Sequence, residues 1–329
     1  MATMKALVLE TYEAPFRLAE IARPSPSNGE VLVRVVASGV NPLDTKIRAG
    51  KADHARHPLP AILGIDMAGI VEEAGPGVTG FSRGDEVYGM TGGVGGVPGS
   101  LAEFQVADAR LLAPKPPHMT MREAAALPLA FITAWEGLFD RIGVKSGQKV
   151  LVLGGGGGVG HVAVQIAKAF GADVYAVDGA GKADYLRSIG ATPIDYAAET
   201  PDDYIARYTD GKGFDAAYDT LGGTGLDTAF KAVARFGHAV SALGWGSHAL
   251  APLSFKAATY SGIFTLIPLV TGEGRDHHGD ILREATRLAQ AGKLVPRLDP
   301  RTFTMDTATD AHRLIEDGGA SGKLVIDIG

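Results

Sequence analysis

The sequence predicts an α/β protein with two domains, one rich in β-strands and one built on a doubly wound parallel sheet. Residues 1 to about 120 contain short β-rich segments separated by clusters of proline and glycine, which is typical of a compact, mainly antiparallel domain. From about residue 122, strand-like and helix-like segments alternate, as in a parallel sheet with helices on both faces. A length of 329 residues and an apolar content of 46% suffice for two hydrophobic cores.

The individual elements follow from these two patterns. The segment after residue 294 returns to strand-like sequence, so we expect the β-rich domain to comprise 1–121 and 295–329 and the parallel-sheet domain to comprise 122–294. The glycine-rich segment 91–100 precedes a strand rather than a helix, which indicates a surface loop, with a cover over the active site as the alternative. The expected strands are MKALVLE, FRLAEI, EVLVRVVASGV, AGIVEEAG, DEVYGM and AEFQVAD, then KVLVLG, DVYAVD, FDAAYDT and GHAVSAL, with helices beginning near Gly158, Gly181, Pro201 and Gly225 and a last one over 306–317.

One strand-to-helix turn of the second domain contains five consecutive glycines. It follows the apolar strand Lys149–Leu153 and precedes apolar residues at helical spacing. Gly155, Gly157 and Gly160 match the G-x-G-x-x-G pattern, in which bare backbone N–H groups at a helix N-terminus hold a diphosphate. The next strand ends 23 residues after Gly155 in Asp178, at the spacing of a carboxylate that binds ribose. This order favours a dinucleotide site over a purely structural turn, and the expected binding residues of the turn are Gly154, Gly155, Gly157, Gly158, Val159 and Gly160.

Composition argues against several function classes. The net charge is −6 and no dense basic cluster is present, so we expect neither a nucleic acid partner nor an anionic membrane surface. The absence of cysteine excludes disulfides, thiolate nucleophiles and thiolate-ligated zinc. The N-terminal segment lacks a signal-peptide pattern and the long apolar runs are interrupted by glycine or proline, so we expect a soluble, cytoplasmic protein.

Several stretches resemble the medium-chain dehydrogenase/reductase superfamily and, within it, the zinc-independent quinone oxidoreductases. The resemblance extends over essentially the full length. It implies a catalytic domain related to the chaperonin-10 (GroES-like) fold, a Rossmann domain, a cleft between them that holds a nicotinamide, and a homodimer formed through the Rossmann sheets. The stretches that carry it are GVNPLD (39–44), GIDMAGIV (64–71), GDEVYG (84–89), AALPLAFITAWEGL (125–138), the glycine turn and FDAAYDTLGG (214–223).

The resemblance also implies chemistry without a metal. Metal-dependent members of the superfamily have a cysteine at the position of Asn41 and a His-Glu pair at the positions of Ile65 and Asp66. An amide and an aliphatic side chain cannot replace a thiolate and an imidazole as zinc ligands, so we expect no metal site. Without a Lewis acid, reduction of a quinone or an α,β-unsaturated carbonyl compound is favoured over alcohol oxidation, because the charge left on oxygen needs only hydrogen-bond donors or water.

Three residues are candidates for the catalytic site. By resemblance, Asn41 lies near the nicotinamide and the substrate, where its amide could donate to a substrate oxygen; an Asn-Pro turn is the alternative reading. Asp44 either caps the short helix that follows or orients Asn41. Thr133 either contacts the nicotinamide end of the cofactor, as its counterpart does in the superfamily, or is a core helix residue.

The sheet edge offers further candidates for cofactor binding. Leu243 and Gly244 follow the strand GHAVSAL at the expected carboxyl edge of the sheet, where doubly wound folds bind their ligands. Phe264 either flanks the nicotinamide or packs in the core.

The choice between NADPH and NADH depends on residues near the adenosine ribose. Asp178 would accept hydrogen bonds from both ribose hydroxyls of NADH and repel a 2′-phosphate. Lys182 and Tyr196 match positions that bind this phosphate in NADPH-using relatives, and Gly179 leaves room for it. We interpret the cofactor as NADPH, with NADH as the open alternative.

The sequence therefore predicts an NAD(P)H-dependent, metal-free reductase of quinones or α,β-unsaturated carbonyl compounds. Solvent is the expected proton source, because no dedicated general acid is evident. Two alternatives stay open. One is a cofactor-binding protein with a structural or regulatory role and little turnover, and the other is an alcohol dehydrogenase, which Asn41, Ile65 and the absence of cysteine oppose.

Overall fold

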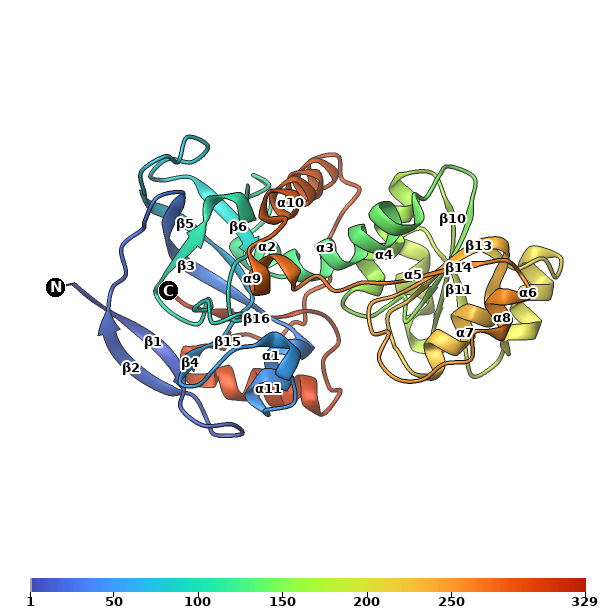
Figure 1. Cartoon of the computed structure of the whole chain (residues 1–329), viewed down its shortest axis with the longest axis horizontal. Coiled ribbons are helices and arrows are strands. Elements are labelled where there is room, and N and C mark those ends of the chain that lie inside the picture. The colour runs from blue at the N-terminus through green and yellow to red at the C-terminus, as the bar shows by residue number, and fades with distance from the viewer. Residues whose placement is uncertain (1) are drawn as a thin grey trace. The chain divides into compact units, whose positions relative to one another are not determined.

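The computed structural model describes residues 2–329, which form two compact units. The first unit comprises the residues up to Leu129 together with Leu266–Gly329, and the second comprises Ala130–Thr265. The sequence pattern places the changes of domain at 121/122 and 294/295 instead. The difference concerns helices such as α2 (Met121–Ala125) and α10 (Arg275–Gln290), which pack on strands of the first unit (Figure 1). A helical pattern alone does not reveal which sheet a helix covers.

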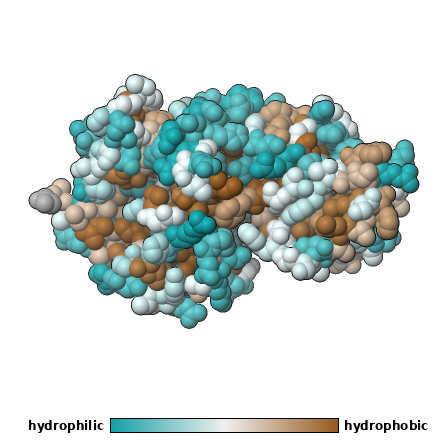
Figure 2. Space-filling view, in the orientation of Figure 1, coloured by the Kyte–Doolittle hydropathy of each residue, from teal (hydrophilic) through white to brown (hydrophobic). Residues whose placement is uncertain are grey.

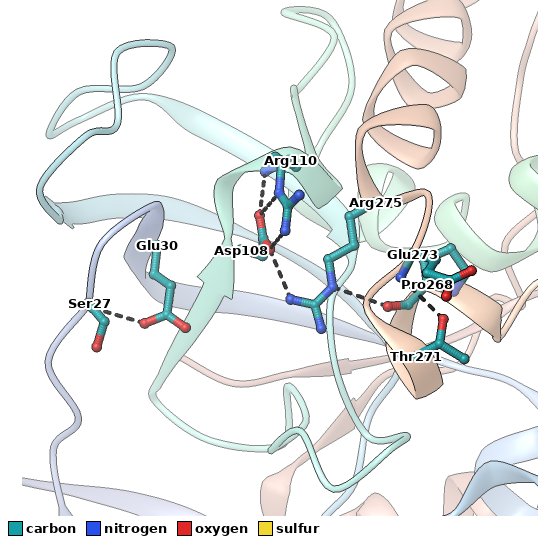
Figure 3. A network of polar contacts seen from close by, with 8 residues as sticks. All are labelled: Ser27, Glu30, Asp108, Arg110, Pro268, Thr271, Glu273 and Arg275. Atoms are coloured by element: carbon teal, nitrogen blue, oxygen red, sulfur yellow. Dashed lines mark hydrogen bonds and ion pairs between the residues drawn. The ribbon is translucent and has the colours of Figure 1, made fainter.

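Ion pairs and hydrogen bonds link the start of α10 to the end of a strand in the same unit (Figure 3). Arg275 donates to Asp108, the last residue of β7 (Phe104–Asp108), over 2.9 Å, and to the carbonyl of Pro268 over 3.1 Å. Arg110 donates to the same carboxylate over 2.8 Å. Burial acts to raise the pKa of Asp108, but hydrogen bonds from Arg110 and Arg275 outweigh it and lower the pKa to about 2. The helix is therefore held to this unit by charge as well as by apolar packing.

Strand β3 (Glu30–Val40) lies at the centre of the first unit. It pairs antiparallel with β5 (Asp66–Ala74), with β7 and with β16 (Leu324–Asp327), within a seven-stranded sheet of order β15-β16-β3-β5-β6-β8 to which β7 adds by pairing with β3. Its alternate residues Val31, Val33 and Val35 enter one core cluster, as the period of a strand requires. The remaining elements are β1 (Thr3–Leu9), β2 (Arg17–Ala22), β4 (Ala61–Ile62), β6 (Glu86–Met90), β8 (Leu112–Pro114), β15 (Phe303–Thr304), α1 (Pro42–Arg48), α9 (Ile267–Thr271) and α11 (Ala308–Glu316).

The second unit is a six-stranded, all-parallel sheet of order β11-β10-β9-β12-β13-β14. Numbered along this unit, the order is 3-2-1-4-5-6, which is that of the doubly wound fold, so the predicted fold class is confirmed. Sequence analysis missed β11 (Thr192–Asp195) and β14 (Thr259–Gly262), because both are short edge strands that lack an apolar run. The other elements are β9 (Lys149–Leu153), β10 (Asp173–Asp178), β12 (Phe214–Asp219), β13 (Val233–Ser241), α3 (Pro128–Trp135), which contains the boundary between the units, α4 (Gly160–Ala169), α5 (Ala183–Ser188), α6 (Pro201–Thr209), α7 (Thr224–Ala232) and α8 (Ala251–Ser254).

The segment 91–100 differs from its prediction. A surface loop was expected, and Gly96 and Pro98 are exposed, but Val94 and Ser100 are fully buried, so the prediction is wrong for the two ends of the segment. The backbone of Gly99 donates to Ile62 over 2.8 Å, and a Cβ at Gly99 would lie only 2.3 Å from the carbonyl oxygen of Leu63. The glycines therefore let this segment pack tightly on the neighbouring chain, which a pattern of hydropathy does not reveal.

The surface is mixed in character. Hydrophobic and hydrophilic residues both lie on the visible face, each gathered in several groups (Figure 2). Within residues 2–329, no helix combines the length and the apolar character needed to cross a bilayer.

Candidate active site

The glycine turn of the second unit requires glycine at specific positions. Gly154 has a left-handed backbone with φ of 76°, and its N–H donates to Val177 over 2.9 Å. A Cβ at Gly160, the first residue of α4, would lie 2.1 Å from the carbonyl oxygen of Gly154, and one at Gly155 would lie 2.6 Å from the Cβ of Ala176. Neither position tolerates a side chain without movement of the backbone. The bare turn therefore brings α4 directly against β9 and β10.

Four residues predicted to bind the adenosine ribose lie together beside this turn. Asp178 ends β10, and its carboxylate accepts hydrogen bonds from the N–H groups of Gly156, over 2.9 Å, and Gly179, over 2.8 Å. The Nζ of Lys182 lies 3.1 Å from the same carboxylate. The hydroxyl of Tyr196 lies beside Gly179, since a Cβ at that glycine would be 3.7 Å from it. The carboxylate of Asp178, the ammonium group of Lys182 and the phenol of Tyr196 thus lie close together beside Gly179.

A buried carboxylate holds the next loops along this edge of the sheet. Asp219, at the end of β12, accepts hydrogen bonds from the N–H groups of Leu221 and Gly222, over 3.0 and 3.1 Å. It also accepts from the hydroxyl of Ser241, over 2.6 Å, and that hydroxyl accepts from the N–H of Leu243 over 3.0 Å. Burial raises the pKa of Asp219, while these hydrogen bonds oppose the rise. Sequence reasoning missed Asp219 and Ser241, although Asp219 ends a predicted strand much as Asp178 does.

The other predicted cofactor contacts lie in the same unit. Gly244 is exposed, and a Cβ there would lie 2.2 Å from the hydroxyl of Tyr260. The hydroxyl of buried Thr133 lies 3.2 Å from that of Thr265. Phe264 packs edge-on against Trp245, with ring centroids 6.2 Å apart.

A dinucleotide fits the carboxyl edge of this sheet. α4 begins at Gly160, so the first N–H groups of the helix and turn have no partner within the helix and lie at its positive end. The turn is bare of side chains, and at Gly160 a Cβ would collide with the carbonyl oxygen of Gly154. The donor groups and the Asp178 carboxylate match the diphosphate and ribose of a nicotinamide dinucleotide.

The first unit contains a second group of predicted site residues. Asn41 lies between β3 and α1 with an extended backbone, φ −122° and ψ 154°. Asp44 lies inside the first turn of α1, and its carboxylate accepts from the backbone N–H of Asn41 over 2.8 Å. This single bond both satisfies a free N–H group at the helix N-terminus and holds the backbone of Asn41. The two readings of Asp44 considered from the sequence are therefore compatible.

The side chain of Asn41 is held between two charged residues. Its Nδ2 donates to Asp66 over 2.9 Å, and its Oδ1 accepts from the Nζ of Lys323. Asn41, Asp66 and Lys323 are 1%, 0% and 6% exposed, respectively. Asp66 also accepts from the N–H of Leu129 over 2.9 Å, and Lys323 also donates to the carbonyl of Val40 over 3.3 Å.

Sheet register explains why these distant residues meet. Gly39 of β3 pairs with Asp66 of β5 on one side and with Val325 of β16 on the other. Asp66 and Lys323 are thereby placed on either side of Asn41, just beyond the end of β3. Sequence reasoning missed Lys323, since only the pairing of β16 with β3 brings it here. It noted Asp66 only as a residue at a metal-ligand position.

Burial perturbs the titration of this cluster. Burial raises the pKa of Asp44 to about 7, and the charge of Asp66 adds to the rise while Lys323 opposes it. Burial also raises the pKa of Asp66 to about 6, against the ammonium of Lys323 and the hydrogen bond from Asn41. The pKa of Lys323 is lowered by burial, although both carboxylates oppose this. The cluster is therefore close to a change of protonation near neutral pH.

The donor set near Asn41 does not suit a metal ion. Ile65 is aliphatic and fully buried, and the amide oxygen of Asn41 already faces an ammonium group, which would repel a cation. Across residues 2–329, no three His, Cys, Asp or Glu side chains come together in a way that could hold a metal.

Comparisons with known proteins agree with this architecture. Residues 27–117 match the family described as the alcohol dehydrogenase GroES-like domain, and residues 189–326 match the zinc-binding dehydrogenase family. A 2-methylene-furan-3-one reductase of Solanum lycopersicum is 37% identical over 316 residues, which cover 94% of this chain and 74% of that protein. The chain belongs to the medium-chain dehydrogenase/reductase superfamily. The resemblance inferred from the sequence motifs is thereby confirmed.

Other members of the superfamily are similar over most of their length. An NADPH-dependent alkenal/one oxidoreductase of Arabidopsis thaliana is 34% identical, over 98% of this chain and 79% of that protein. The chloroplastic quinone oxidoreductase QR1 of Triphysaria versicolor is 31% identical, over 98% of both proteins. The crystal structure of an alcohol dehydrogenase superfamily protein from Novosphingobium aromaticivorans is 57% identical, with a TM-score of 0.98 over 99% of this chain and all of that one.

The raised pKa of Asp44 predicts a pH-dependent stability. Between about pH 4 and pH 7 the folded protein binds more protons at Asp44 than the unfolded chain does, so this group makes stability fall as the pH rises. The slope is at most about 1.4 kcal/mol per pH unit. In Asp44→Asn the neutral amide can still accept from the N–H of Asn41. We expect the free energy of unfolding of this variant to fall less between pH 5 and pH 7 than that of the wild type, as measured by urea denaturation.

The exposed acid Asp53 provides the control for this measurement, since Asp53→Asn should keep the wild-type dependence on pH. Equal slopes for Asp44→Asn and the wild type would contradict the assignment.

Proposed function

We propose that the protein is an NADPH-dependent reductase of α,β-unsaturated carbonyl compounds and quinones that works without a metal ion. The relatives named for reduction of a furanone, of alkenals and enones, and of quinones support this substrate class. The observation that carries the proposal is the amide of Asn41, held by Asp66 and Lys323 where metal-dependent members have a cysteine. A hydrogen-bond donor thus takes the place of a metal ligand.

The residues of the second unit would hold the cofactor. The N-terminal end of α4 and the bare turn before it would bind its diphosphate, and Asp178, Gly179, Lys182 and Tyr196 would surround its adenosine ribose. Leu243, Gly244, Thr133 and Phe264 are proposed contacts toward the nicotinamide end. When bound, reduced nicotinamide supplies a hydride.

The residues of the first unit would stabilise the charge that reduction produces. A hydride added to the β-carbon of an enone leaves negative charge on the carbonyl oxygen. The N–H of Asn41 can donate to that oxygen, and a donor held rigidly in a buried site is worth more than the same donor in water. We expect solvent to deliver the proton to carbon, since the two oxygens of Asp66 are engaged by Asn41 and by the N–H of Leu129, and Asp44 is buried.

The test of this function is the steady-state oxidation of NADPH with a short-chain enone, an alkenal and benzoquinone. We expect turnover with at least one acceptor, unchanged after dialysis against EDTA. NADPH binding without turnover on any acceptor would favour a cofactor-binding protein with a structural or regulatory role. Activity lost on chelation and restored by zinc, with alcohols as substrates, would favour an alcohol dehydrogenase.

The residues around the ribose predict how the cofactor preference can be changed. In NADPH, the 2′-phosphate would accept a charge-assisted hydrogen bond from Lys182, whereas Asp178 repels it. We therefore expect Lys182→Ala to raise the KM for NADPH by about tenfold with little effect on NADH, and Asp178→Ser to shift the ratio of kcat/KM values toward NADPH.

Arg187 of the same helical segment provides a matched control, because it is exposed and pairs with Asp184. Arg187→Ala should behave as the wild type. An equal loss with both cofactors in Asp178→Ser would instead indicate that the turn, which Asp178 supports through Gly156, has collapsed.

We also propose that two copies associate through the second unit, as the resemblance implies. β14 lies at the edge of its sheet and is paired with β13 alone among the described strands, which leaves one row of backbone groups for a second copy. The rings of Phe236 and Phe255, on the same unit, are 84% and 86% exposed. Light scattering should give twice the chain mass of 34.1 kDa, and a mass of one chain would contradict the proposal.

A further inference from the structure

We propose that Lys323 and Asp66 are positioning residues that hold the Asn41 carboxamide in one orientation, leaving a single N–H group free to receive the substrate oxygen. This inference rests on the proposed function, and it assigns a role to two residues that were not among the predicted catalytic residues.

The orientation of the amide follows from the chemistry of its neighbours. An ammonium group can only donate hydrogen bonds and a carboxylate can only accept them. Asn41 turns its Oδ1 to Lys323 and its Nδ2 to Asp66, so both contacts are attractive. Rotating the amide by half a turn would set its NH₂ group against the ammonium and its oxygen against the carboxylate. Both contacts would then be repulsive, and in a buried site that repulsion is weakly screened.

This orientation limits what the amide can do next. Its oxygen is engaged by Lys323, and one of the two hydrogens on Nδ2 is engaged by Asp66. The remaining N–H is a donor, and donation suits an oxygen that gains negative charge during reduction. The positive charge at the amide oxygen also polarises the group, which strengthens donation from its nitrogen.

The two clamping residues are themselves anchored to the backbone. Asp66 accepts from the N–H of Leu129 with its other oxygen, and Lys323 donates to the carbonyl of Val40. Asp44 holds the backbone of Asn41. Asp66, Lys323 and Asp44 are therefore each anchored to the backbone at the end of a strand or helix, which leaves the amide of Asn41 little freedom to rotate.

The charges that face Asp66 are the ammonium of Lys323 and the carboxylate of Asp44. Burial raises the pKa of Asp66 to about 6, so above this pH it is ionised and acts only as an acceptor. A protonated Asp66 could donate as well, and the preference of the amide for one orientation would weaken.

The first measurement follows the side-chain NH₂ group of Asn41 by NMR. The chain contains two asparagines, buried Asn41 and exposed Asn28, so labelling with ¹⁵N-asparagine gives two side-chain NH₂ signal pairs in an NMR spectrum. We expect the hydrogens of Asn41 to exchange with water far more slowly than those of Asn28. In Lys323→Met the exchange at Asn41 should become faster and its signals should move, while those of Asn28 stay unchanged.

The second measurement reads turnover of an enone at saturating NADPH. We expect Lys323→Met to lower kcat by 10-fold to 100-fold, on the order of the loss of an oriented donor, without a change in the Kd for NADPH. Lys323→Gln, which keeps a neutral donor, should fall between this variant and the wild type. Asp66→Asn, which can present either end of its amide to Asn41, should also lower kcat and serves if Lys323→Met does not fold.

Lys115 provides the matched control, because it is another buried lysine of the first unit and donates to the carbonyls of Pro116 and Met119. Lys115→Met removes a buried ammonium elsewhere, and its folded fraction should keep kcat within about twofold. Folded Lys323→Met with unchanged kcat, or with unchanged signals from Asn41, would overturn the positioning role. Absence of turnover in the wild type with every acceptor would instead overturn the proposed function.

Discussion

The burial of the Lys323 ammonium is the constraint on which the first unit's site depends. A charged group removed from water is costly unless oxygens surround it, and here the oxygens come from Asn41 and Val40, with two carboxylates nearby. All of these partners lie within residues 40–66, far from Lys323 in the sequence. Correct pairing of β5 and β16 with β3 is therefore a condition for satisfying the charge, so the fold and the site are built by the same interactions.

In the second unit, buried or half-buried carboxylates hold the loops at the carboxyl edge of the parallel sheet. Its ligands must approach a backbone, so glycines keep the space over the turn clear while Asp178 and Asp219 hold the strand ends through N–H groups. Each carboxylate ends a strand of one parallel sheet, where successive loops come together at the same edge. The proposed binding of the nicotinamide cofactor would thus rely on backbone groups, which substitutions elsewhere change little.

Local patterns made much of the fold predictable from the sequence. The glycine turn and Asp178 belong to one strand–helix–strand segment, and a short window contains all of their information. The β-rich segments of the first unit and the four longest strands of the second were likewise recognisable by their apolar runs. The short edge strands β11 and β14 were missed because an edge strand needs little apolar sequence.

Long-range contacts account for what sequence reasoning did not find. The contact of Lys323 with Asn41 depends on the register of β16, and the burial of Ser100 depends on the path of the chain near Gly64. For Asp44, the sequence suggested either a helix cap or a residue that orients Asn41, and one hydrogen bond from the N–H of Asn41 serves both purposes. Propensities describe neighbours in the chain, whereas these contacts arise only after the strands have paired.

The proline after Asn41 has a consequence for the chemical lifetime of the site. Asparagine is lost spontaneously when the backbone nitrogen of the following residue attacks the side-chain carbonyl and closes a succinimide ring. Pro42 has no N–H to lose in that attack, so Asn41 is shielded from this route, whereas exposed Asn28 precedes Gly29, the least hindered neighbour. Ageing of the protein should therefore convert exposed Asn28 to aspartate and isoaspartate and spare Asn41, on which the proposed reaction depends.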